Sequence, residues 1–247
     1  MATETGQHPV AVQHPVAVSR SVPVRLVIFD CDGVLVDSEH IAVRIHTELG
    51  TELGWALSPS EVAHLFIGKS AASIRDVIAA RLGDTVAGRW DAEFHRRLAD
   101  AFETQLRPVE GIVEALAAIR LPTCVASSGT HGKLRHSLGQ VGLYESFAGR
   151  VFSATEVPRG KPAPDLFLHA AERMDVEPEA CVVVEDSRFG VEAARAAGMR
   201  CLGYAGGVTR ADQLAGPGTV VFEHMRDLPR LLTRASTESP LVPEVHG

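Results

Sequence analysis

Cysteine is scarce in this chain, and its few residues lie far apart. They form no CxxC pair in 247 residues, so neither a structural zinc site nor a disulfide framework is expected. Three of them lie in or beside apolar runs that are typical of strands, where cysteine behaves as a small buried hydrophobe. The cysteines are Cys31, Cys124, Cys181 and Cys201. This usage suits a reducing compartment, and we expect a cytoplasmic protein.

Long apolar runs and basic clusters are also missing. No segment approaches the roughly 20 apolar residues that a membrane-spanning helix needs. The formal net charge of -7 argues against nucleic acid as a partner, because that binding depends on neutralising phosphates. The hydrophobic content of 45% is ordinary for a soluble globular protein. We therefore expect a small-molecule ligand, with no nucleic acid and no membrane as partner. No pattern marks a contact surface, so we expect a monomer or a weak homodimer.

The two ends of the chain lack the pattern of a folded segment. Residues 7–18 are a tandem repeat of Gln-His-Pro-Val-Ala-Val, without the basic start and longer apolar centre of a secretory signal. A proline follows each histidine of the repeat and disfavours a helix that would align the two rings on a metal. We predict disordered tails at residues 1–21 and 235–247.

The rest of the chain divides into a helical stretch and a βα alternation. After Ser38 the periodicity is helical to about Gln105, with a capping-box pattern and an early proline at residues 58–61. From Pro108 onward, strands and helices alternate, which is typical of a parallel sheet covered by helices on both faces. We predict an α/β fold, a doubly wound, Rossmann-like parallel sheet with an inserted all-helical cap. The predicted core comprises residues 22–37 and 108–234, and the predicted cap comprises residues 38–107.

Two carboxylates stand at the end of the first apolar run. Residues 24–29 fit a strand buried on both faces, and Asp30 and Asp32 follow it directly. Ligands of parallel sheets bind beyond the carboxyl ends of the strands, and two close carboxylates repel unless a cation lies between them. An ordinary turn is the alternative interpretation. A calcium loop counted from Asp30 is excluded, because it needs Gly and Glu where the chain has Leu35 and Ile41.

A hydroxyl-rich turn, Ser127-Ser128-Gly129, follows the strand predicted at residues 123–126. Backbone N–H groups and hydroxyls at the start of a helix bind phosphate well. Serine and glycine are also common in ordinary loops and helix caps, so this turn alone leaves both interpretations open.

Lys161 lies in a loop held by Pro162 and Pro164, just before a predicted helix. A lone lysine is usually a solvated charge. Here the prolines restrict the backbone on either side, which would help to hold a cation over a phosphate.

Two adjacent acids, Glu185 and Asp186, directly follow the strong strand pattern of residues 181–184. Asp186 or the next residue, Ser187, could simply cap the following helix. Two acids at the rim of a sheet also suit Mg²⁺, which takes hard oxygen ligands.

These four motifs, in this order and with helices inserted after the first, resemble the haloacid dehalogenase-like superfamily of phosphotransferases. The resemblance covers residues 24 to about 232 and is closest to the helical-cap branch, which holds β-phosphoglucomutase and many sugar-phosphate phosphatases. It implies a Mg²⁺-dependent reaction through an aspartyl phosphate. The implied catalytic residues are Asp30 as nucleophile, Asp32 as general acid/base and Lys161 as stabilising cation. The other implied contacts are Ser127, Ser128, Gly129 and Lys161 to phosphate, and Asp30, Asp32, Glu185 and Asp186 to the metal.

Individual residues at family positions restrict the activities that we expect of this chain. Asp32 argues against a dehalogenase, which lacks a carboxylate at this position in the family pattern. Ala71 and Ala42 stand where the mutase pattern has Arg and His, which weakens the mutase interpretation. Lys69 could supply a cation to the substrate, though without the bidentate grip of Arg.

Residues 123–138 are similar to a bacterial subgroup that includes a 6-phosphogluconate phosphatase. We therefore predict a phosphatase of small phosphorylated sugars or sugar acids, with a β-phosphoglucomutase-like isomerase as the alternative. A binding module without turnover is disfavoured, because the four residues expected to carry the chemistry are all present. Three further candidate substrate contacts are His40, His131 and Lys133, although an ordinary surface residue is the favoured interpretation of each.

Overall fold

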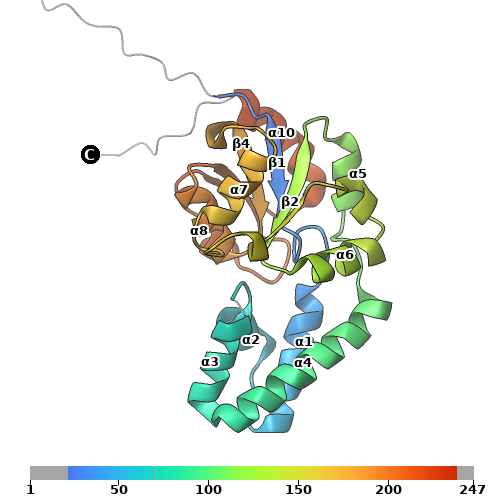
Figure 1. The fold of residues 1–247 in the computed structure, drawn as a ribbon, viewed down its shortest axis with the longest axis vertical. Coiled ribbons are helices and arrows are strands. Elements are labelled where there is room, and N and C mark those ends of the chain that lie inside the picture. Colours follow the sequence, from blue (N-terminus) through green and yellow to red (C-terminus); the bar gives the residue numbers. More distant parts are fainter. Residues whose placement is uncertain (1–21, 70, 238–247) are drawn as a thin grey trace, which may run out of the picture.

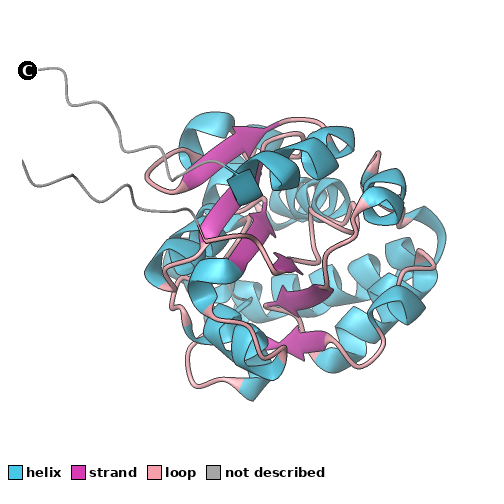
Figure 2. Ribbon diagram, turned by 90° about the horizontal axis from the view of Figure 1, so that it is seen from above, coloured by secondary structure: helices cyan, strands magenta, loops and turns pink. Residues whose placement is uncertain are grey.

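The computed structural model describes residues 22–69 and 71–237, in which a parallel sheet is covered by helices (Figures 1 and 2). The sheet within these ranges has six strands in the order β3-β2-β1-β4-β5-β6. The strands are β1 Leu26–Phe29, β2 Thr123–Ser127, β3 Val151–Ser153, β4 Cys181–Glu185, β5 Arg200–Tyr204 and β6 Thr219–Phe222. This is the doubly wound order, in which the connections change direction beside β1. The predicted fold class is confirmed.

Alternate strand residues feed two apolar clusters on opposite faces of the sheet. Val27 and Phe29 belong to the cluster with α5, α6 and α10, whereas Leu26 and Ile28 belong to the cluster with α7, α8 and α9. These helices are α5 Ile112–Ala118, α6 His131–Gln140, α7 Asp165–Arg173, α8 Arg188–Ala196, α9 Ala211–Leu214 and α10 Leu228–Thr237. Burial on both faces explains why the strands are continuous apolar runs. All four cysteines are buried and free, one more than the three for which the sequence predicts burial.

Four helices inserted between β1 and α5 form a separate bundle beyond the carboxyl ends of the strands (Figure 1). They are α1 Glu39–Leu53, α2 Pro59–Phe66, α3 Ala71–Leu82 and α4 Asp84–Gln105. Their centre is aromatic. The buried Trp90 donates a hydrogen bond from Nε1 to Nδ1 of His46 at 3.0 Å, and Phe94 stacks on the His46 ring with centroids 3.9 Å apart. Burial, aided by His95, lowers the pKa of His46 to about 3, so the ring is a neutral acceptor.

Local sequence signals explain most of the boundaries in this bundle. The capping box at the start of α2 forms as predicted, with Ser58 and Glu61 bonding reciprocally. Helix α4 begins at Asp84 and buries Ala87 and Trp90 within its first two turns. Gly83, at a φ of +86°, separates α3 from α4, a conformation that glycine adopts readily.

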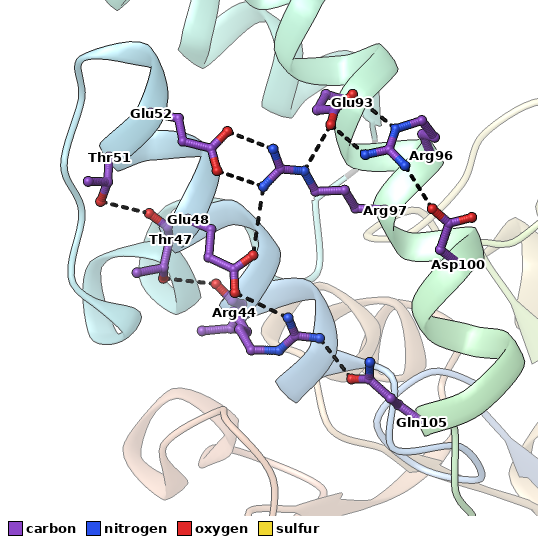
Figure 3. A network of polar contacts seen from close by, with 11 residues as sticks. Arg44, Thr47, Glu48, Thr51, Glu52, Glu93, Arg96, Arg97, Asp100 and Gln105 are labelled. Carbon is purple, nitrogen blue, oxygen red and sulfur yellow. Dashed lines mark hydrogen bonds and ion pairs between the residues drawn. The ribbon is translucent and has the colours of Figure 1, made fainter.

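A network of exposed ion pairs joins α1 to α4 on the outside of the bundle (Figure 3). The guanidinium of Arg97 on α4 binds both carboxylate oxygens of Glu52 on α1, at 2.8 and 2.6 Å, and also contacts Glu93. Arg44 on α1 donates to Gln105 at 2.8 Å. Pairs in water contribute little individually, so the aromatic centre contributes most to the stability of this bundle.

The two linkers between the bundle and the sheet run side by side. The backbone N–H of Asp37 donates to Arg107 at 2.9 Å, and that of Val109 donates to Leu35 at 3.1 Å. These bonds hold the first turn of α1 over the end of β1. We retain as a proposal that residues 38–107 are a cap and that residues 22–37 and 108–234 are the core.

The C-terminal helix extends beyond the predicted core. Helix α10 continues to Thr237, into the segment that the sequence suggested as a tail, because Leu228 and Leu232 are buried against the sheet cluster. The repeat at residues 7–18 and the remaining tail residues, 1–21 and 238–247, lie outside the described residues. Within the described ranges, no helix is both long and apolar enough to cross a bilayer.

Candidate active site

The residues predicted from four separate motifs meet where the connections of the sheet change direction. Asp30 follows β1, Ser127 ends β2 and Glu185 ends β4, and β1 lies between the other two strands. The backbone N–H of Asp30 donates to Val184 at 3.0 Å, which brings Asp30 beside the end of β4. In doubly wound sheets this crevice is where ligands bind.

Lys161 is the cation at the centre of this group. Its Nζ lies 2.9 Å from Oδ1 of Asp30 and 2.7 Å from Oε1 of Glu185, and its side chain is only 4% exposed. The ring of Phe167 lies under the ammonium at 4.9 Å. Burial alone would lower the pKa of Lys161, but the charges of Asp30 and Glu185 outweigh it and raise the pKa. The lysine is therefore a fixed positive charge.

Glu185 is fully engaged by the protein. Besides Lys161, it accepts hydrogen bonds at Oε2 from the backbone N–H of Ser187 at 2.7 Å and from its hydroxyl at 2.9 Å. Gly190 packs so closely that an added methyl group there would overlap the Glu185 carboxyl group. Glu185 thus orients Lys161 and the turn after β4.

Asp30 has a cation beside it, whereas Asp186 has none in the part of the chain that the structure describes. Oδ1 of Asp30 contacts the ammonium of Lys161, but the buried oxygens of Asp186 accept no bond from an N–H or hydroxyl group of the described residues and lie against the carboxyl group of Glu39. Burial, together with Glu185 and Asp32, raises the pKa of Asp30 to about 7 despite Lys161. Burial raises the pKa of Asp186 well above its usual range, and Glu39 and Glu185 add to it.

These carboxylates suit a hard cation. One ligand atom from each of Asp30, Glu185 and Asp186 lies within 4.8 Å of the others. Buried carboxylates without partners are costly unless a positive ion accompanies them, and oxygen donors of this kind are those that Mg²⁺ prefers. Because the Glu185 oxygens already accept from Lys161 and Ser187, Asp30 and Asp186 are the side chains best able to bind a metal directly.

Asp32 lies beside Asp30 but has partners of its own. Its Oδ1 accepts a hydrogen bond from the hydroxyl of Ser38 at 2.7 Å, and its Oδ2 lies 2.6 Å from Nζ of Lys133. Burial works to raise the pKa of Asp32, yet Lys133 and Ser38 together hold it below its usual range. The sequence placed Lys133 among the uncertain substrate contacts and did not foresee its pairing with Asp32, which depends on the orientation of α6.

The predicted phosphate turn lies at the start of α6. Ser127 is 1% exposed and its hydroxyl accepts from the backbone N–H of Gly129 at 3.3 Å, while Ser128 is exposed. The hydroxyl of Ser153 donates to the carbonyl of Gly129 at 2.7 Å and fixes the turn from the side of β3. Helix α6 thus points its N-terminus at the end of β2, an orientation that suits an anion.

The cap brings one loop against the core. Gly68, between α2 and α3, packs on the turn after β4, since an added methyl there would lie 3.1 Å from Cβ of Ser187. Lys69 follows in this loop. His131 pairs with Glu156 at 2.9 Å, whereas His40 is exposed, lies 3.9 Å from Asp37 and lines a cavity that Glu39 also borders. His131 is therefore accounted for by its contact with Glu156.

Glu39 is the site residue to which the sequence assigned no role. It begins α1 and is 9% exposed, and no N–H or hydroxyl group of the described residues donates to its Oε2. Burial raises the pKa of Glu39 to about 8, against a hydrogen bond with the carboxyl group of Asp186 that lowers it and together with the charges of Asp32 and Glu185. The sequence held a signal for this role, because Glu39 follows Asp32 by only seven positions and the linker places it near the end of β1.

Comparisons with known proteins agree on one family. Residues 24–198 match the haloacid dehalogenase-like hydrolases. The chain is 35% identical over 210 residues to 6-phosphogluconate phosphatase of Escherichia coli (strain K12), covering 84% of this chain and 94% of that protein. It is 33% identical over 177 residues to a fructose-1-phosphate phosphatase of the same organism, covering 70% and 92%.

Solved structures of the same kind share the fold. A conserved haloacid dehalogenase-like protein of unknown function from Agrobacterium tumefaciens is 37% identical and superimposes with a TM-score of 0.78. The match covers 85% of this chain and 98% of that one.

Proposed function

The chain belongs to the haloacid dehalogenase-like hydrolases and is a phosphatase of that family, and we propose that it hydrolyses small phosphorylated sugars or sugar acids. In this proposal the reaction depends on Mg²⁺ and passes through an aspartyl phosphate on Asp30. The observation that carries it is the buried group of Asp30, Lys161 and Asp186, a nucleophile beside one fixed cation and one carboxylate that lacks a cation.

Asp30 and Asp32 divide the chemistry. A carboxylate oxygen of Asp30 attacks phosphorus and the bond from phosphorus to the substrate oxygen breaks, which leaves the phosphoryl group on Asp30. Ser38 and Lys133 bind both oxygens of Asp32 and keep it ionised, so Asp32 must take up a proton and give up one of these contacts before it can protonate the departing oxygen. In the second half-reaction, Asp32 takes a proton from the attacking water, the bond from phosphorus to Asp30 breaks, and phosphate leaves.

The remaining residues stabilise charge. Lys161 contacts Asp30, so its ammonium is placed to neutralise the equatorial phosphoryl oxygens as they approach. Ser127 and the backbone of Ser128 and Gly129, at the start of α6, would bind those oxygens from the other side. Asp30, the carbonyl of Asp32 and Asp186 would hold the Mg²⁺, with Glu185 orienting the turn beside them. When bound, the ion supplies positive charge that favours attack on phosphorus.

The choice of substrate class draws on the relatives. The name of one relative gives 6-phosphogluconate as its substrate, and the name of another gives fructose 1-phosphate. Both substrates are phosphorylated sugars or sugar acids, which is the class that we propose. The cap loop carrying Lys69 packs beside the turn after β4, where it could contact the part of the substrate that is not transferred.

The direct test is phosphate release from a panel that includes 6-phosphogluconate and glucose 6-phosphate, with Mg²⁺ and with chelator. These two substrates differ at the carbon that carries either a carboxylate or a reducing end. Release that requires both Mg²⁺ and Asp30, with Asp30→Asn as the blank, supports the proposal and ranks the substrates. Isomerised sugar phosphate without release would instead identify a mutase, and no reaction on any member would contradict the substrate class.

A further inference from the structure

We propose that Glu39 is a further residue of the metal centre, which holds the ion through a bound water and ties the first cap helix to it. This inference rests on the proposed function insofar as it requires a divalent cation between Asp30 and Asp186. No family motif described above includes Glu39.

Two of the five carboxylates in the site have no ammonium group beside them in the described part of the chain. Five buried or half-buried carboxylates share two ammonium groups: Lys161 contacts Asp30 and Glu185, and Lys133 contacts Asp32. The two carboxylates without a cation are Asp186 and Glu39. Among the described residues, no N–H or hydroxyl group donates to either oxygen of Asp186 or to Oε2 of Glu39, and the two carboxyl groups contact each other. One divalent cation would neutralise this remaining pair.

Gly33 shows that the two carboxylates border the same point. An added methyl group at Gly33 would overlap the Asp186 carboxylate and would lie 3.0 Å from the carboxyl carbon of Glu39. Gly33 has a φ of +75° and thus turns the chain away from the site. The absence of a side chain there allows Asp186 and Glu39 to approach each other from different parts of the fold.

The space beside Glu39 suits an ion that keeps its water. A cavity of about 780 Å³ is bordered by both Gly33 and Glu39 and continues toward the ends of β5 and β6. Its acidic lining includes Asp37, Glu110 and Glu223. Because Mg²⁺ loses water reluctantly and usually keeps several ligands from solvent, Glu39 would accept a hydrogen bond from a coordinated water, with Asp30 and Asp186 binding directly.

This arrangement couples the metal to the cap. Glu39 is the first residue of α1, so a bond from its carboxylate to the hydrated ion fixes the first turn of the cap on the core. Metal binding should then protect the backbone of that turn, and loss of the Glu39 charge should remove the protection without removing the ion altogether.

The experiment measures Mg²⁺ binding to the intact protein by calorimetry, in wild type and in Glu39→Gln. The matched control is Glu110→Gln, an equal change of charge on the same cavity at a side chain that is 88% exposed. We expect Glu39→Gln to weaken Mg²⁺ binding about 10- to 100-fold, as loss of partners beyond the direct ligands typically does. The control should bind like wild type. Hydrogen exchange should show Mg²⁺-induced protection at the start of α1 in wild type and in the control only.

The melting temperature in chelator separates this role from a structural one. Removing one of two unpaired carboxylates should leave Glu39→Gln at or above the wild-type melting temperature. A lower melting temperature, or unchanged Mg²⁺ affinity, would overturn the inference while leaving the proposed function intact. If wild type itself binds no Mg²⁺, the metal-dependent function fails, and this inference fails with it.

Discussion

The cap and the sheet core both bury polar groups, but they treat them in opposite ways. In the cap, His46 is held neutral by burial and accepts a hydrogen bond from Trp90, so its polar atom is satisfied within the protein. At the core, the buried oxygens of Asp186 and Oε2 of Glu39 receive no N–H or hydroxyl donor from the described residues. The polar group of the cap thus stabilises the fold, whereas these carboxylates are available to a ligand.

The charged contacts of the two regions differ in the same way. The ion pairs of the cap are exposed and join α1 to α4 on the outside (Figure 3). Those of the core are buried and centre on Lys161, whose side chain is 4% exposed. Interactions of the first kind contribute little to stability, and those of the second kind cannot lose a partner without leaving a buried charge. Mutations in the cap should therefore change mainly the free energy of unfolding, and mutations at the buried ion pairs of the core should change mainly the rate of phosphate release.

The largest expected effect is that of Asp30→Asn on turnover. The amide cannot act as the nucleophile, so phosphate release should fall on the order of 10⁴-fold or more, as for other residues that form the covalent intermediate. The variant should still fold, because the change keeps the size of the side chain. Phosphate release and a thermal melt measure the two outcomes. Turnover within tenfold of wild type would contradict the assignment of Asp30.

In the cap, Trp90→Ala should cost about 3–5 kcal/mol of unfolding free energy, because it removes a large, fully buried ring. Chemical denaturation provides the measurement. Trp90→Phe, which keeps one aromatic ring and loses the second ring together with the bond to His46, should cost clearly less. Equal losses for the two variants would indicate that the hydrogen bond and the second ring, and not the ring that Phe keeps, dominate.

The pH dependence of stability should also distinguish the regions. In chelator, the folded pKa of about 7 for Asp30 and about 8 for Glu39 exceeds the usual values of 3.8 and 4.5. The folded state therefore binds more protons than the unfolded state, and stability falls as pH rises from about 4 to 8. Because His46 has a lowered pKa, the cap instead loses stability as pH falls below 6.5.

Denaturation in chelator between pH 7.5 and 8.5 isolates the core, since His46, whose unfolded pKa is 6.5, is almost entirely neutral there in both states. Stability should decrease across this interval, and saturating Mg²⁺ should abolish or reverse the decrease. A flat profile in chelator would mean that these carboxylates are not held as the structure indicates.

The smallest effect should come from Arg97→Ala in the exposed network of the cap. We expect little change in the denaturation midpoint and no change in Mg²⁺ affinity, because such ion pairs are largely balanced by solvation and side-chain entropy. Arg44→Ala provides a second variant of the same kind. A loss comparable to that of Trp90→Ala would show that the network, and not the aromatic centre, holds α1 against α4.

Sequence reasoning succeeded where the signal is local. An apolar run followed by acids predicted both β1 with Asp30 and β4 with Asp186, because strands of a parallel sheet end at the same edge. The capping box of α2 was likewise readable, since Ser58 and Glu61 lie within one turn of each other.

Sequence reasoning failed where two interacting residues lie far apart along the chain. The bond between Lys133 and Asp32 spans 101 positions and depends on how α6 is rotated. The approach of Glu39 to Asp186 depends on the linker and on the space at Gly33.

The central claim, that Asp30 carries the phosphoryl group, is tested most directly by trapping the intermediate. Enzyme mixed with a turned-over sugar phosphate and Mg²⁺ would be quenched in acid, digested and mapped by mass spectrometry. The account predicts one phosphoryl group on the peptide that contains Asp30, absent in Asp30→Asn and in chelator. A phosphoryl group found on another residue, or rapid turnover with no trapped phosphoenzyme, would contradict it.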